Sequence, residues 1–123
     1  GHLRGSIYKR ANFEDCGYIL TLDGKRLYQP GDTVLLAEHL EMHNIDALFV
    51  SPTEHNTHIE QSAMMINAMN PQYIFPQHYG TYIPNEQNYF WTIGYVDELR
   101  AQLSETMRQR FHQLKQGEVF IMK

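Results

Sequence analysis

An α/β fold, with helices and strands in alternating layers, is the class that the sequence predicts. Two apolar runs, residues 46–52 and 73–76, lack polar alternation and are therefore typical of strands buried on both faces. The expected order is hairpin, helix, strand, helix, strand, helix and strand, which contains two β-α-β units. The chain has 123 residues, of which 42% are hydrophobic, as expected of one globular domain.

The N-terminal elements are predicted by turn residues. Residues 17–29 alternate apolar and polar positions around an Asp-Gly pair, which favours a hairpin with a two-residue turn. The sequence Pro-Gly-Asp-Thr at 30–33 then ends the second strand. Residues 34–43 carry apolar side chains at helical spacing, and Thr33 is placed to cap them. A short helix is therefore expected after the hairpin.

The run at 46–52 should be the central strand of the sheet. After it, Thr57 and Glu60 have the spacing of a capping box, which predicts a helix that ends at about Asn70, before a proline. The run at 73–76 predicts the next strand.

The C-terminal part is predicted by the apolar residues from Val96 to Leu114, which recur at intervals of three and four. This spacing indicates an amphipathic helix of roughly five turns. Residues 118–122 read as a last strand. The polar and aromatic loop at 81–92, before the helix, is expected to border a substrate pocket.

Composition excludes several classes of protein. The net charge is −4 and the ten Lys and Arg residues are scattered, so nucleic acid is not expected as a partner. A single cysteine, Cys16, allows neither an intrachain disulfide nor a thiolate metal cluster and fits a cytoplasmic location. No run approaches the roughly 18 apolar residues of a membrane helix, so no membrane association is expected. Phosphate-binding loops of the G-x-x-x-x-G-K type and G-x-S-x-G elbows are absent from the sequence.

Asp32 and His78 are the principal candidates for a metal site. Each follows a predicted strand and lies beside a glycine, so both are expected at the same edge of the sheet, where α/β proteins bind ligands. Either residue alone has a plainer interpretation, since Asp32 can cap a turn and a lone histidine is often structural.

Four further histidines are weaker candidates. His55 and His58 follow the predicted central strand, although helix capping explains part of that segment. His39 and His43 are one helical turn apart but do not fit the H-E-x-x-H pattern, and we interpret this pair as surface residues.

In combination, these segments resemble a known family. The hairpin around Asp23-Gly24, the Gly-Asp-Thr of residues 31–33 and the His-Tyr-Gly-Thr of residues 78–81 resemble, in order and spacing, the C-terminal half of metallo-β-lactamase-fold hydrolases. The branch that holds L-ascorbate-6-phosphate lactonase-like enzymes is the most similar. The resemblance covers about residues 17–83 and implies half of an αββα sandwich.

The resemblance also implies roles for particular residues. Asp32 would bridge two divalent metal ions, His78 would bind the second, and His2 stands at the distance from Gly17 at which the family has another histidine. Zinc or manganese is expected, with iron also compatible with such ligands. The implied reaction is hydrolysis of a small-molecule ester, lactone or phosphodiester by a metal-bound hydroxide.

The family's first-half signature, H-x-H-x-D-H, is absent from these 123 residues. The chain, 1–123, is therefore predicted to be a C-terminal half that is inactive alone, and a missing N-terminal half or a second copy should cover one face of its sheet. Two alternatives remain. One is a non-catalytic interaction module that uses the helix at 96–114 as its contact surface. The other is an independent α/β binding domain.

Overall fold

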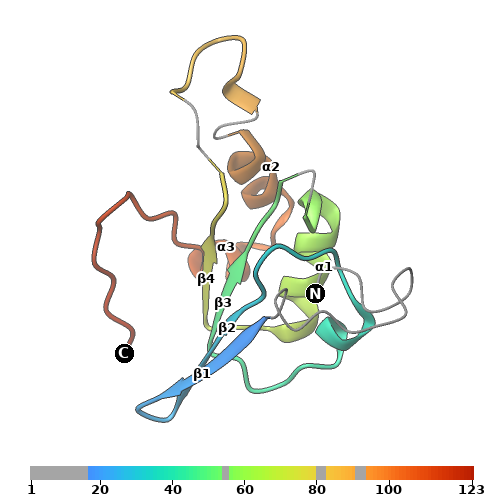
Figure 1. Ribbon diagram of the computed structural model, residues 1–123, viewed down its shortest axis with the longest axis vertical. Helices are drawn as coiled ribbons and strands as arrows, with labels where there is room; N and C mark the ends of the chain where they lie inside the picture. Colours follow the sequence, from blue (N-terminus) through green and yellow to red (C-terminus); the bar gives the residue numbers. More distant parts are fainter. Residues whose placement is uncertain (1–16, 54–55, 80–82, 91–93) are drawn as a thin grey trace.

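The computed structural model describes residues 17–53, 56–79, 83–90 and 94–123. In these residues a four-stranded sheet is combined with helices that lie mainly on one of its faces (Figure 1). In chain order the elements are β1 (Tyr18–Leu22), β2 (Lys25–Gln29), the 3-10 turn η1 (Ala37–Leu40), β3 (Ala47–Val50), α1 (His58–Met69), β4 (Tyr73–Pro76), α2 (Tyr95–Gln102) and α3 (Glu105–Gln109).

The sheet has the strand order β1-β2-β3-β4. The hairpin β1–β2 is antiparallel, and its turn residues Asp23 and Gly24 have φ angles of 51° and 78°, as a tight two-residue turn requires. The strands β2, β3 and β4 run parallel to one another. Their carboxyl ends therefore meet at one edge of the sheet. The predicted α/β class is confirmed, as is the interior position of β3.

Helix α1 connects β3 to β4 and buries an apolar stripe that includes Ile59, Met65 and Ile66. It ends at Asn70, whose left-handed backbone (φ 49°) precedes the proline that the sequence indicated. The predicted capping box at its start is wrong. The Thr57 hydroxyl makes no cap; it donates to the Ser51 carbonyl oxygen at 2.8 Å and so attaches the start of α1 to the end of β3.

The prediction of a helix at 34–43 is wrong, because this segment contains only the one-turn η1. Its capping position, Leu36, has an extended backbone, and the Leu36 N–H donates to His39 Nδ1 at 3.0 Å. A side chain therefore binds a backbone group at the start of the turn, and Thr33, the expected cap, donates its hydroxyl to the Val34 carbonyl.

The prediction of one long helix from Val96 to Leu114 is also wrong, because two shorter helices, α2 and α3, form instead. The chain breaks at Leu103, which is extended (ψ 150°), and Ser104 starts α3 by accepting a hydrogen bond from the Met107 N–H at 3.2 Å. Most of the predicted apolar stripe is confirmed, because Val96, Leu99, Leu103, Met107 and Phe111 are buried. Leu114, its last member, is half-buried and lies beyond α3. The last strand, expected at 118–122, does not form.

The two faces of the sheet differ in how they are covered. Across the strands, Tyr28, Leu48 and Ile74 are in register and pack with α1 and α2 into the main hydrophobic core. The opposite face, which we call the open face, carries the in-register row Leu20, Leu27, Ala47 and Tyr73. Figure 1 shows α1 on one side of the sheet and the C-terminal segment on the other.

Part of the open face is covered by the C-terminal segment. The ring of Phe120 lies 5.2 Å from that of Phe75 and 5.7 Å from that of Tyr73, measured between centroids. By contrast, Leu20 and Leu22 of β1 remain 52% and 61% exposed. None of the helices in the described ranges is long and apolar enough to cross a membrane.

Candidate metal site

Asp32 and His78 come together at the carboxyl edge of the parallel strands. Asp32 lies three residues after β2 ends, and His78 lies two residues after β4 ends. The distance between His78 Nδ1 and Asp32 Oδ1 is 3.0 Å. His78 has a left-handed backbone (φ 57°), a conformation in which histidine is more frequent than most residues. The turn after each strand therefore directs one polar side chain toward the other.

The same ring nitrogen of His78 faces a second polar group. Its Nδ1 atom is 3.0 Å from the amide nitrogen of Asn56, which also donates to Thr53 Oγ1 at 2.9 Å. A protonated Nδ1 donates to Asp32, whereas an unprotonated Nδ1 accepts from Asn56, so one proton decides which partner is bonded. Asn56 is buried, and this fixes its position beside the ring.

The chemistry of this pair fits a divalent cation. A carboxylate and an imidazole are common zinc and manganese ligands, and the Asp32 and His78 side chains are 72% and 47% exposed, so an ion can reach them from solvent. The described residues contain no group of three or more His, Cys, Asp or Glu that could hold a metal. Asp32 and His78 are thus two groups that could hold a metal. His2, the third predicted ligand, lies outside the described residues.

Beneath these two residues, a pair of glutamine side chains joins β2 to β4. The Gln29 amide nitrogen donates to Gln77 Oε1 at 2.6 Å, and the Gln77 amide nitrogen donates to Gln29 Oε1 at 2.5 Å. Gln29 Oε1 also accepts from the Gly31 N–H at 3.1 Å. We refer to Gln29 and Gln77 together as the amide clasp.

The interpretation of His39 as a surface residue is wrong. His39 is 2% exposed, and its Nε2 lies 3.0 Å from the Tyr28 hydroxyl while its Nδ1 accepts from the Leu36 N–H. Burial lowers the pKa of His39 below its ordinary value, and burial followed by the charge of Glu38 raises that of Tyr28. His39 is therefore a neutral structural residue. His43 is exposed, as expected.

Of the remaining histidine candidates, His58 contacts an aromatic residue of α2. The ring of His58 is in edge-on contact with Tyr95, with a centroid distance of 6.0 Å. His55 falls outside the described residues, as does Cys16.

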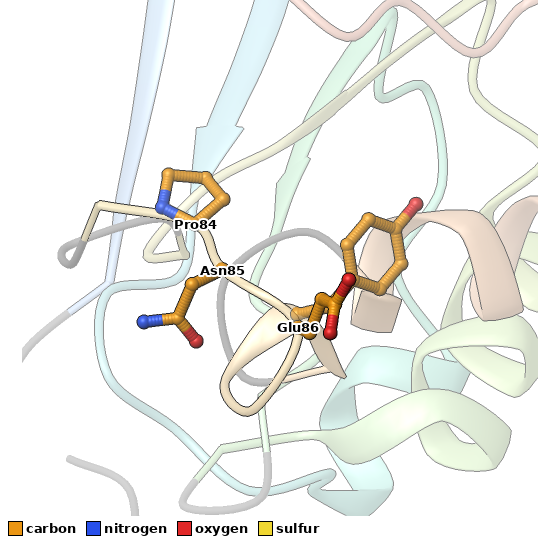
Figure 2. A pocket seen from close by; sticks show the side chains of 4 residues that line it. Pro84, Asn85 and Glu86 are labelled. Carbon is orange, nitrogen blue, oxygen red and sulfur yellow. The ribbon is translucent and has the colours of Figure 1, made fainter.

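The loop expected to border a pocket contains an open hollow of about 590 Å³ lined by Pro84, Asn85, Glu86 and Tyr89 (Figure 2). Neither Asp32 nor His78 lines it. Tyr82 and Trp91, also expected there, lie outside the described residues. The hollow is mainly apolar in character and offers one carboxylate, so by itself it defines no reaction site.

Sequence reasoning missed the polar residues that support the pair. Gln29 and Gln77 are 48 positions apart, and Asn56 and His78 are 22 apart. No local spacing identifies such partners. One signal was available, however, because Gln29 ends one predicted strand, Gln77 directly follows another, and a candidate ligand comes within three residues of each glutamine.

Comparisons with known proteins place the chain near metal-dependent hydrolases. It is 31% identical over 74 residues to a UPF0173 metal-dependent hydrolase of Pyrococcus furiosus, an alignment that covers 56% of this chain and 33% of that protein. Its structure resembles that of a proposed metal-dependent hydrolase from Parabacteroides distasonis, with a TM-score of 0.61, 26% identity and coverage of 79% of this chain and 39% of that one. No family model matches.

The chain thus spans about a third of the curated relative's length. Both comparisons cover more than half of this chain, one in sequence and one in structure. We conclude that the chain is similar, in sequence and in fold, to part of a metal-dependent hydrolase.

Proposed function

We propose that the chain is the C-terminal part of a metal-dependent hydrolase of the metallo-β-lactamase superfamily, and that Asp32 and His78 hold a divalent metal ion. The single observation that carries this proposal is the 3.0 Å approach of an exposed carboxylate and a half-exposed imidazole at the carboxyl edge of parallel strands. The similarity to two proteins named as metal-dependent hydrolases supports it.

A bound metal would supply Lewis acidity and an activated water for hydrolysis of a small-molecule ester, lactone or phosphodiester. The contribution of the chain's own residues is positional. Asp32 provides negative charge and His78 provides a ring nitrogen. Without a metal, Asn56 holds the ring by donating to Nδ1, and a metal bound at this nitrogen would replace that hydrogen bond. Two ions, zinc or manganese, and a further ligand such as His2 belong to this proposal.

Metal titration by calorimetry tests the site. The chain, stripped with a chelator, should bind zinc or manganese, and Asp32→Asn and His78→Ala should each weaken that binding by at least tenfold. His43→Ala is the matched control, since His43 is an exposed histidine outside the pair. Equal affinity in all four proteins, or no binding by the wild-type chain, would contradict the proposal.

We propose further that a segment of the whole protein outside this chain covers the open face. Along the row Leu20, Leu27, Ala47 and Tyr73, exposure is concentrated on β1, where Leu20 and Leu22 are more than half exposed. At the other end of the row, Ala47 is fully buried and the ring of Tyr73 packs against that of Phe120. Neighbouring exposed apolar side chains often mark a surface that another segment or protein covers. The alignment covers 33% of the curated relative, so most of that protein has no counterpart in the matched segment and could supply the cover.

Light scattering on the isolated chain tests this second proposal. Without its cover, the open face should drive self-association, and Leu20→Lys together with Leu22→Lys should return the chain to 14.5 kDa. The same substitutions should abolish binding of an apolar dye. A wild-type chain that is monomeric and binds no dye would rule the proposal out.

The alternative of a non-catalytic interaction module required the apolar residues at 96–114 to be exposed as a contact surface. Of the stripe from Val96 to Leu114, the residues Val96, Leu99, Leu103, Met107 and Phe111 are buried within the core, where they contact the chain itself. These five residues are therefore not available as a contact surface for a partner.

A further inference from the structure

We propose that the amide clasp, Gln29 with Gln77, is a positioning device that sets Asp32 relative to His78. The clasp joins the ends of β2 and β4 across the strand between them, and each of its members lies within three residues of one candidate ligand. This inference rests on the proposed function, because it assigns a purpose to the clasp within the same metal site.

The clasp has both hydrogen bonds that a pair of primary amides can form. Each side chain donates once and accepts once, at distances of 2.6 Å and 2.5 Å. A third contact extends it, since Gln77 Nε2 lies 3.3 Å from the Ser51 hydroxyl at the end of β3. All three parallel strands are therefore connected through side chains at their carboxyl ends, in addition to the backbone ladder.

On the Asp32 side, the clasp acts through the turn. Gln29 Oε1 accepts from the N–H of Gly31, the residue before Asp32. Gly31 has a φ of 70°, so the chain reverses at a position that the hydrogen bond holds in place. Because Gln77 occupies the other side of Gln29 Oε1, movement of Gln77 should be transmitted to the Gly31–Asp32 turn.

On the His78 side, the clasp acts through the strand. Gln77 directly precedes His78, and its backbone N–H donates to the Val50 carbonyl oxygen at 2.8 Å. The Gln77 residue is thus fixed to β3 by its backbone and to β2 by its side chain. The backbone of His78 therefore follows a residue that is held in place, although the His78 side chain itself is half exposed.

A purely structural role makes a different prediction from a positioning role. If the clasp only strengthened the sheet, removing it would lower stability everywhere and leave the geometry of the folded site unchanged. If it positions the site, loss of Gln77 should loosen the Gly31 amide, whose hydrogen bond is to Gln29, and should weaken metal binding while the core amides stay protected.

The experiment compares Gln77→Leu with Gln72→Leu, a control that replaces an exposed glutamine five residues earlier. Hydrogen exchange of the Gly31 amide is measured by NMR in the metal-free chain, with the amides of β3 as the reference for global unfolding. Gln77→Leu should speed exchange at Gly31 about tenfold relative to β3, the effect of one lost hydrogen bond, whereas Gln72→Leu should not. A second variant, Gln77→Glu, keeps the size of the side chain but cannot donate to Gln29 Oε1, and should give the same result at Gly31.

Zinc or manganese titration of the same proteins completes the test, and Gln77→Leu should weaken the affinity by about 10- to 100-fold, as loss of a ligand-supporting contact does. Unchanged exchange of the Gly31 amide in both Gln77 variants would overturn the proposed positioning role of the clasp, whatever the metal affinity. Unchanged metal affinity in Gln77→Leu, with a wild-type chain that binds metal, would overturn it too. A wild-type chain that binds no metal, while Gly31 exchange still responds to Gln77, would overturn the proposed function and leave the mechanical coupling established.

Discussion

At the scale of single residues, protonation states are set by which hydrogen bonds a side chain must satisfy. His39 accepts from the Leu36 N–H through Nδ1, so Nε2 must carry the proton of the neutral ring and faces the Tyr28 hydroxyl at 3.0 Å. A second proton would break the bond to Leu36. Burial and this contact therefore both favour the neutral ring and maintain η1.

Acid should destabilise the protein through His39. Burial lowers its folded-state pKa below the ordinary 6.5, so the unfolded chain binds the proton first as the pH falls. The stabilisation is complete above about pH 6.5 and is lost progressively below it. Urea unfolding at pH 7.5 and 5.5 should show a smaller loss in His39→Gln than in the wild type. The exposed control His43→Gln should behave as the wild type, and an equal acid loss in all three would contradict this role.

Two of the three predicted site residues could be located from the sequence because each follows a recognisable strand. The end of a parallel strand is a defined place in space, so Asp32 and His78 were expected at one edge and lie 3.0 Å apart there. Their function as ligands stays a prediction. Asn56 and the amide clasp could not be found in this way, since their partners are set by tertiary packing.

At the scale of elements, segments whose local signals agreed with their packing were predicted accurately. The bounds of β4 match the predicted strand at 73–76, and α1 ends at Asn70 as its turn chemistry indicated. The helix at 96–114 was predicted from periodicity alone. Periodicity continues across Leu103 and Ser104, but a serine that caps the next turn allows the chain to bend there while its apolar residues stay buried.

Replacing Thr57 tests how α1 is attached to the sheet. Its buried hydroxyl donates to the Ser51 carbonyl and lies 2.5 Å from the Ser62 hydroxyl. Thr57→Val preserves the shape but leaves the Ser51 carbonyl without this donor, so the free energy of unfolding should fall by about 1–3 kcal/mol. Thr106→Val, an exposed helical position, is the control and should change it by less than about 0.5 kcal/mol. Equal effects in chemical denaturation would refute the attachment.

At the scale of the whole molecule, the core lies on one side of the sheet, and the exposed leucines of β1 lie on the other. Leu48 and Leu99 are fully buried between the sheet and its helices, whereas Leu22 on β1 is 61% exposed. The sequence predicted the α/β order because β-α-β connections permit few arrangements. It did not predict that the last segment would lie across Tyr73 and Phe75 without forming a strand.

This asymmetry predicts unequal responses to truncation of leucines. Leu99→Ala should lower the free energy of unfolding by about 2–5 kcal/mol, because it leaves a cavity in the packed core. Leu22→Ala should lower it by less than about 1 kcal/mol in the monomeric chain. Thermal and chemical unfolding below the association concentration measure both. A large loss in Leu22→Ala would mean that the open face is packed against a part of the chain outside the described residues.

The most direct test of the metal site is an anomalous-scattering map from crystals of the chain grown with zinc. We expect a peak bonded to both Asp32 and His78, at about 2.0–2.2 Å from a carboxylate oxygen and a ring nitrogen. A metal found only elsewhere, with the direct contact of 3.0 Å between Asp32 and His78 preserved, would contradict it.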